Sequence, residues 1–173
     1  MATWEKEADA LHASGARHAL ILSGRSDARG QIAEGIARAL APRQIRISSA
    51  GAAPGAVDPI AVRVLAELSV VGSDLRARTL DEVDVTGVGA IVVLSEEDPT
   101  PPALRGVLRV HWPLTDPAHG GGSEEERIER YRAVRNELRR RLIRVFAREA
   151  IPSGGTESLT TSVGPASGGD MDA

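Results

Sequence analysis

The sequence contains no cysteine among its 173 residues. This absence excludes disulfide bonds, catalysis by a thiolate and any metal site with cysteine ligands. No apolar run approaches the roughly 20 residues of a membrane-spanning helix, and the segment Met1 to Glu5 does not begin a secretory signal. We therefore expect a cytoplasmic protein with no membrane partner.

Lysine is almost absent, since Lys6 is the only lysine among the 21 cationic residues and all the others are arginine. The net charge of −3 gives no general attraction to nucleic acid or to an anionic membrane. Arginine favours carboxylate and phosphate partners, but so broad a bias is also typical of a genome's overall composition. We favour the compositional interpretation and expect no nucleic-acid partner.

One segment organises the chain. The apolar run 18–22 ends in a loop of small and polar residues, Ser23 to Arg29, and a helical pattern with Ile32 and Ile36 on its apolar face follows at once. A strand, tight loop and helix in this order place the free N–H groups of the helix terminus in the loop, where they attract anions. Arg29 would clamp an oxyanion with its planar guanidinium. The residues expected to bind the oxyanion are Gly24, Arg25, Ser26, Asp27, Ala28, Arg29 and Gly30.

The rest of the chain alternates between helical and strand patterns. Asp58 with Pro59 predicts the start of a helix, and Ser123 with Glu126 forms the capping box of the last one. The other predictions are a helix over 4–13, a half-covered strand over 44–49, a loop over 50–55, a short helix near 79–82, and strands over 89–94 and 107–110. This alternation predicts an α/β fold with a four-stranded parallel sheet and helices on both faces.

The composition changes after residue 150, where glycine, serine and threonine dominate and no lysine or arginine occurs. Such a segment cannot bury enough apolar surface to offset its ordering entropy. We therefore predict an N-terminal helical extension over 1–16, one folded domain over 17–149 and a disordered tail over 150–173. No cofactor and no metal site is predicted.

The segment 22–31 resembles the phosphate-binding loop of low-molecular-weight protein tyrosine phosphatases and of the related thioredoxin-coupled arsenate reductases. In that motif a cysteine is followed by five residues, an arginine and a serine or threonine. Further similarities lie at 48–51, 73–82, His111-Trp112 and Asp116-Pro117, and they extend from about Ala19 to Arg148. The resemblance implies a Rossmann-like three-layer sandwich, with Ser23 in the nucleophile position, Arg29 as the anion clamp and Asp116 in the position of the general acid.

The same resemblance shows where this chain departs from the family pattern. The nucleophilic cysteine is replaced by Ser23, and a hydroxyl needs an adjacent general base to act as a nucleophile. Gly30 stands where a hydroxyl normally hydrogen-bonds the thiolate, and Ser26 replaces the loop asparagine. The two further cysteines of the reductase relay are replaced by Ser95 and Pro102. Arsenate reduction by the cysteine relay is therefore excluded.

Three functions remain open. The first is a pseudoenzyme that binds an inorganic oxyanion, or a phosphorylated ligand or protein partner, through the Ser23–Arg29 loop. The second is a phosphomonoester hydrolase, with phosphotyrosine among its candidate substrates and with Ser23 in the nucleophile position by nature or by engineering. The third is a scaffold whose loop binds nothing. Because five positions differ from the motif together, a single engineered substitution does not explain the pattern, and we favour the first function.

Overall fold

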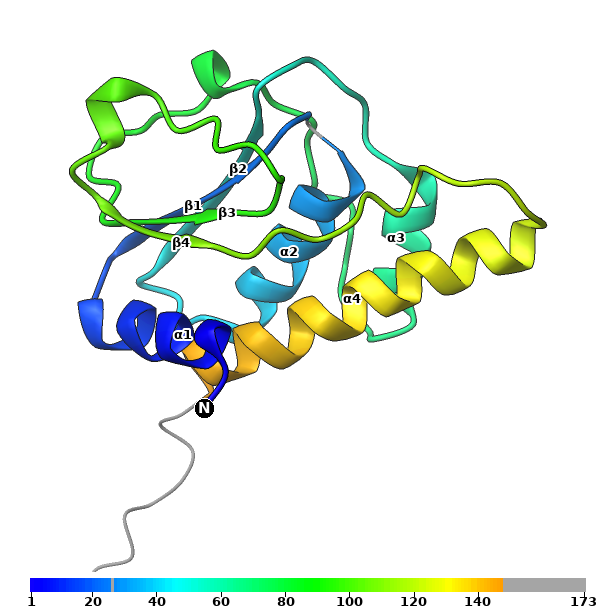
Figure 1. Cartoon of the computed structure of the whole chain (residues 1–173), viewed down its shortest axis with the longest axis horizontal. Coiled ribbons are helices and arrows are strands. Elements are labelled where there is room, and N and C mark those ends of the chain that lie inside the picture. Colours follow the sequence, from blue (N-terminus) through cyan, green and yellow to red (C-terminus); the bar gives the residue numbers. More distant parts are fainter. Residues whose placement is uncertain (26, 148–173) are drawn as a thin grey trace, which may run out of the picture.

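The computed structural model describes residues 1–25 and 27–147. Its centre is a four-stranded sheet in the order β2-β1-β3-β4, with every neighbouring pair parallel (Figure 1). The strands are β1 (His18–Ser23), β2 (Arg46–Gly51), β3 (Ala90–Val93) and β4 (Leu108–His111). The predicted four-stranded parallel sheet is confirmed.

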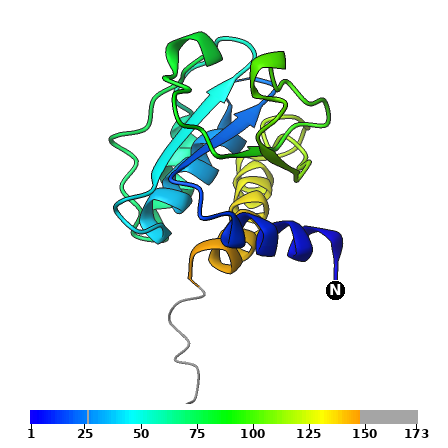
Figure 2. The same ribbon diagram turned by 90° about the vertical axis from the view of Figure 1, so that its left-hand side faces the viewer.

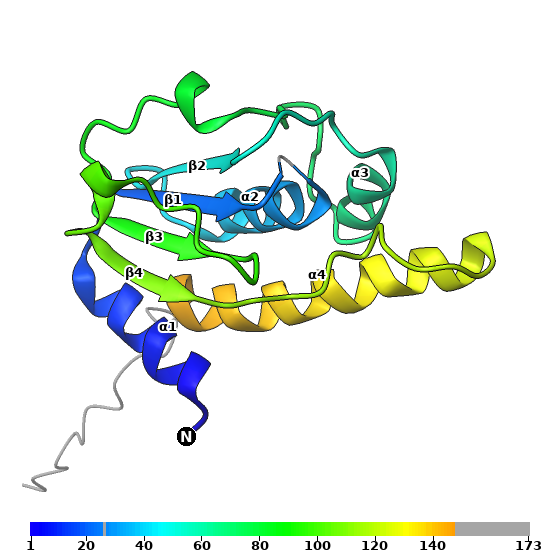
Figure 3. The same ribbon diagram turned by 45° about the horizontal axis from the view of Figure 1, so that its top comes forward.

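The helices and turns form a layer on each side of this sheet. The α-helices are α1 (Thr3–Ser14), α2 (Ala28–Leu40), α3 (Pro59–Ala66) and α4 (Glu124–Phe146). They enclose the larger apolar core with one face of the sheet (Figures 2 and 3). On the other face, Leu20, Leu22 and Ile91 pack under the segments that carry the 3-10 helices η1 (Leu80–Glu82) and η2 (Pro102–Leu104). The three-layer arrangement therefore has α-helices on one face and short 3-10 helices on the other.

Polar side chains define the helix starts that the sequence predicts. The Asp58 carboxylate accepts hydrogen bonds from the N–H groups of Ile60 at 2.8 Å and Ala61 at 3.3 Å, and it opens α3. Ser123 accepts from Glu126 N–H at 3.2 Å, and the Glu126 carboxylate accepts from Ser123 N–H in return. Both predicted caps are confirmed, because each satisfies N–H groups that have no partner within the helix.

The prediction for the second strand is wrong in two respects. Strand β2 begins at Arg46 and runs through Gly51, into the segment predicted as a loop. It is also buried on both faces from Ile47 onward, rather than half-covered. Two serines make this burial possible, because Ser48 hydrogen-bonds His18 Nε2 at 2.9 Å and Ser49 donates to the Glu34 carboxylate. A buried hydroxyl with a partner costs little, so the polar residues of β2 do not mark a solvent face.

Helix α1, predicted as an N-terminal extension, contributes Ala8 and Leu11 to the larger core. The Asp9 carboxylate also pairs with Arg144 of α4, at 2.8 Å from Nε. No helix among the described residues has the length and apolarity to cross a bilayer. The predicted disordered tail over 150–173 lies outside the described residues, as does Ser26 of the loop.

Candidate functional site

The Ser23–Arg29 loop lies where strand order reverses. Strand β1 is flanked by β2 on one side and β3 on the other, and the loop follows its carboxyl end. Ligands of open parallel sheets bind at this position. Ser23 is the last residue of β1, Asp27 is the N-cap of α2, and Ala28, Arg29 and Gly30 form the first turn of that helix. The structure thus brings the predicted loop residues that it describes to one edge of the sheet.

Ser23 has no base. Its side chain is buried, with 1% of the residue exposed, and its hydroxyl donates to the carbonyl oxygen of Arg25. A carbonyl accepts a hydrogen bond but does not take up the proton, so this contact does not activate the oxygen for attack. The same carbonyl accepts from Asp27 N–H at 2.8 Å, which closes the start of the loop. The hydroxyl therefore acts as a structural donor in this conformation.

Arg29 is held inside the site by neighbouring oxygens. Its Nη2 lies 2.7 Å from Asp27 Oδ2, and its Nη1 donates to the carbonyl oxygen of Leu114 at 2.8 Å. Asp27 Oδ1 also accepts from the Arg29 backbone N–H at 3.0 Å, so one carboxylate both caps α2 and neutralises the guanidinium. Only 8% of Arg29 is exposed, while Arg25 is exposed. The arginine predicted to clamp an anion therefore already holds an internal carboxylate.

Asp116 lies in the segment that reaches this site. Leu114, two residues earlier, is the carbonyl partner of Arg29. The Asp116 carboxylate accepts from Ala118 N–H at 2.9 Å and contacts His119 Nδ1 at 3.0 Å. The first contact closes a turn that contains Pro117. The second places the exposed imidazole of His119 beside the carboxylate of the proposed acid. Asp116 is thus positioned by its own turn, two residues after the carbonyl that binds Arg29.

The segment after β3 forms another wall. A Cβ placed on Gly24 would lie 3.6 Å from Ser95 Cβ, so residue 95 lies directly against the loop. Ser95 donates from its hydroxyl to the Glu97 carbonyl at 2.7 Å, and its own carbonyl accepts from His111 Nε2 at 2.6 Å. Pro102, at the second relay position, lies in η2. His111 therefore fixes the wall of the site and the neighbouring Trp112 is buried behind it.

Sequence analysis missed a polar layer behind the loop. Glu34 of α2 is fully buried, accepts from Ser49 and pairs with Arg38 and, at 3.6 Å, with Arg78. Gln31, one turn earlier, donates to the Ala56 carbonyl at 2.8 Å and accepts from Asp58 N–H at 2.8 Å. The sequence does contain a signal for this layer, because Gly30 and Gly35 flank Gln31 and Glu34. Small residues on several faces of a helix indicate that the helix is packed on all sides.

These polar groups do not form a metal centre. Within 1–25 and 27–147, no group of three histidine, aspartate or glutamate side chains is arranged to hold a metal ion. Asp27 is paired with Arg29 instead, and Glu34 is paired with Arg38 and Arg78. The arrangement can accept an oxyanion at Arg29 only if the Asp27 carboxylate moves away from the guanidinium.

Comparison with known proteins decides the family. No family model matches the chain. An arsenate reductase from Halalkalibacterium halodurans is 31% identical over 121 residues, which cover 69% of this chain and 86% of that protein. An arsenate reductase from Bacillus subtilis is 33% identical over 119 residues, covering 66% and 84%. The chain belongs to the family of arsenate reductases and low-molecular-weight tyrosine phosphatases.

Solved structures of the family have the same fold. An arsenate reductase in an oxidized state aligns with a TM-score of 0.65 and 23% identity, over 76% of this chain and 98% of that one. The tyrosine phosphatase of Erwinia amylovora aligns with a TM-score of 0.62 and 20% identity, over 75% and 91%. This family member differs from the expected motif at its centre, because it contains no cysteine at all.

Proposed function

We propose that this chain is a non-catalytic family member that binds an oxyanion, free or as a phosphoryl group, through the Ser23–Arg29 loop. One observation carries the proposal: the buried Arg29 guanidinium is held at the loop against an oxygen pair, that of the Asp27 carboxylate. A ligand oxyanion offers Arg29 the same kind of partner. On binding, Arg29 therefore exchanges the Asp27 carboxylate for the ligand anion. The affinity depends on the difference in free energy between these two interactions.

The chemistry at Ser23 supports binding without turnover. The Ser23 hydroxyl donates to a backbone carbonyl, and the loop offers no histidine to take its proton. The family's route depends on a cysteine thiolate that helix N–H groups and a nearby cation stabilise. A serine hydroxyl in the same position gains little from those groups at neutral pH. Phosphoryl or arsenyl transfer to Ser23 is thus not expected.

Phosphate titration by calorimetry tests the proposal. Asp27→Asn should tighten phosphate binding about tenfold, because asparagine retains an oxygen to cap α2 but loses the competing charge. Arg29→Ala should abolish binding, and Arg25→Ala, which removes an exposed arginine of the same loop, should weaken it less. Thermal melting of each variant shows that the fold is intact. Phosphate binding that is indifferent to Arg29 would contradict the proposal.

A scaffold function is the second candidate, and the same ion pair favours it. Because Asp27 and Leu114 already satisfy the Arg29 guanidinium, the loop is stable with no ligand. Under this alternative neither the chain nor Asp27→Asn binds phosphate, and Asp27→Asn loses stability because the ion pair is broken. The calorimetry and the melting curves together separate the two functions.

A further inference from the structure

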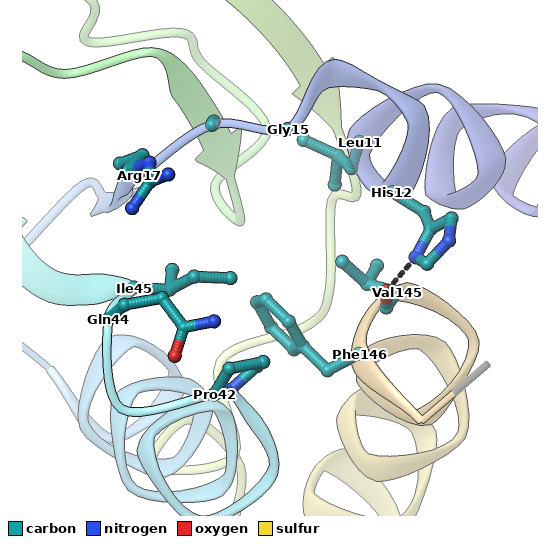
Figure 4. Close-up of a pocket in the computed structure, with 10 residues that line it drawn as sticks. Leu11, His12, Gly15, Arg17, Pro42, Gln44, Ile45, Val145 and Phe146 are labelled. Atoms are coloured by element: carbon teal, nitrogen blue, oxygen red, sulfur yellow. Dashed lines mark hydrogen bonds between the residues drawn. The ribbon is translucent and has the colours of Figure 1, made fainter. Parts of the chain in front are cut away.

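A cavity of about 240 Å³ opens at the opposite end of the sheet from the Ser23–Arg29 loop (Figure 4). Its lining comes from the end of α1, the residues that lead into β1 and β2, and the end of α4. Gly15, the C-cap of α1, lies at its mouth with a φ of 61°, and a Cβ there would meet no atom within 4 Å. The left-handed conformation favours glycine, and its lack of a side chain helps keep the mouth open.

The floor of this cavity is apolar. Leu11, Ile45, Val145 and Phe146 line it, and Figure 4 shows the side chains of Ile45 and Phe146 projecting into the space. The same four residues, with Ala16, also line a second cavity of about 30 Å³ whose walls carry only apolar side chains. These shared side chains border both the outer space and the narrow apolar space. An aliphatic chain fits such a floor better than a polar ligand does.

The rim is polar, and its positive charge has no counter-charge among the described residues. Arg17 and Gln44 lie on one side of the space and His12 lies across it (Figure 4). His12 donates from Nδ1 to the Val145 carbonyl at 2.7 Å. Within the described part of the chain, the Arg17 guanidinium and the Gln44 amide have no hydrogen-bond or ion-pair partner. None of the described residues that line the cavity is acidic, so the described rim complements an anion.

We propose that this cavity is a binding site for a medium-chain aliphatic carboxylate. The carboxylate accepts hydrogen bonds from Arg17 at the rim, and the chain lies against Leu11, Ile45 and Phe146 toward the inner cavity. A single anionic group suits the rim, because one arginine supplies the charge and a guanidinium binds a carboxylate with two parallel bonds. The site is remote from the loop at Arg29 and does not depend on the function proposed for that loop.

Calorimetry of the full chain with octanoate tests the proposal, with 1-octanol as the neutral probe. Octanoate should bind saturably, and hexanoate should bind more weakly by about fourfold per missing methylene that the floor buries. Arg17→Gln should weaken octanoate binding at least about fivefold and leave 1-octanol binding unchanged. Arg105→Gln is the matched control, because it removes the charge of an exposed arginine outside the cavity and should change neither.

A second variant tests the floor. Ile45→Phe adds volume where the two cavities meet and should weaken both probes, with an unchanged melting temperature as the check on folding. Arg29→Ala should leave octanoate binding unchanged, so failure of the loop proposal does not affect this one. Absence of saturable octanoate binding, or equal octanoate binding by the unchanged chain and by Arg17→Gln, would overturn the proposal.

Discussion

Ser23 and Gly30 face each other between the end of β1 and the first turn of α2. A Cβ on Gly30 would lie 3.2 Å from Ser23 Oγ, and the next nearest atoms would be 3.9 and 4.0 Å away. A side chain at position 30 would therefore contact Ser23 Oγ before any other atom. In the family motif, a hydroxyl at this position hydrogen-bonds the nucleophile. The geometry for that hydrogen bond persists in this chain although both of its groups have changed.

Restoring the nucleophile alone should give little phosphatase activity. Ser23→Cys supplies a thiol, but Gly30 has no side chain to donate a hydrogen bond to it. Asp27 also neutralises Arg29, so the thiolate at position 23 would be poorly stabilised. The double variant with Gly30→Ser should hydrolyse p-nitrophenyl phosphate faster, by about tenfold for one charge-assisted hydrogen bond. Adding Asp27→Asn should raise the rate again. Rates across pH, with phosphate release as a check, measure these steps.

Asp116→Asn provides the control within that active background. Loss of a general acid should slow substrates with poor leaving groups more than activated aryl phosphates. Robust activity of the unchanged chain that disappears in Ser23→Ala would instead establish a serine nucleophile. Full activity from Ser23→Cys alone would show that Gly30 and Asp27 do not limit the site.

Sequence reasoning could find the members of this site but not all of their partners. It predicted Arg29 as an anion clamp, because the place of this residue after the strand and loop follows from spacing, and that role stays a prediction. It counted Asp27 only among the loop residues expected to bind the oxyanion. That Asp27 both caps α2 and pairs with Arg29 depends on where the side chains point, which spacing does not determine. The Leu114 carbonyl, 85 residues away from Arg29, gives no signal in the sequence.

At the scale of elements, local chemistry predicted helix starts better than strand coverage. Asp58 and Ser123 begin α3 and α4 because their side chains bond N–H groups two and three residues away. Coverage of β2 depends on distant segments, since η1 and its neighbours cover the face that carries Ser48. A polar residue on a strand indicates solvent only when no distant partner exists. His18, the partner of Ser48, is 30 residues away in the chain.

Gly35 determines how closely α2 approaches α3. A Cβ at this position would lie 2.8 Å from Leu65 Cδ1 and 3.2 Å from Cδ2, and Leu65 is fully buried. Alanine gains up to about 1 kcal/mol of helix propensity over glycine, whereas overpacking a well-filled core costs about 1–3 kcal/mol. Because Leu65 is fully buried against this position, we expect Gly35→Ala to lower the free energy of unfolding by about 1–2 kcal/mol, measured by urea denaturation.

Gly106→Ala is the comparison for this prediction. A Cβ on Gly106 would meet no atom within 4 Å, so the change adds no volume to the core. It should alter the free energy of unfolding by less than about 0.5 kcal/mol. Equal stability of the two variants would mean that α2 and α3 move apart at little cost, and that close packing at Gly35 does not define their separation.

Across the whole molecule, α4 connects the other α-helices. Arg144 pairs with Asp9 of α1, and Tyr131 donates to the Asp58 carboxylate at the cap of α3 at 2.7 Å. Glu67, at the end of α3, accepts from Arg132 at 2.6 Å and from Arg135 at 2.5 Å. Figure 3 shows α4 running along the layer that contains α2 and α3. Polar contacts therefore hold α1 and α3 to α4, and two groups in these contacts, Glu67 and Tyr131, have shifted pKa values.

Glu67 and Tyr131 should affect the stability of the fold at opposite ends of the pH range. Hydrogen bonds from Arg132 lower the pKa of Glu67 from 4.5 to about 2, with Arg135 adding to them. Burial raises the pKa of Tyr131 from 10.0 to about 12, with the Asp58 carboxylate adding to it. Because the pKa of Glu67 is lowered in the folded state, its carboxylate stabilises the fold above pH 4.5, and that contribution is lost as the pH falls toward 2. A raised tyrosine pKa favours the fold below pH 10, and that contribution is lost as the pH rises toward 12.

Urea denaturation across pH should separate these contributions. The stability lost by Glu67→Gln should be constant above about pH 5 and should shrink toward zero near pH 2, where the protonated carboxyl resembles the amide. The loss from Tyr131→Phe, about 1–2 kcal/mol for a hydrogen bond to a carboxylate, should be constant to about pH 10 and shrink above it. Glu125→Gln, at an exposed position on α4, should show neither trend. A difference for Glu67→Gln that does not change with pH would mean that the arginines of α4 do not hold this carboxylate in solution.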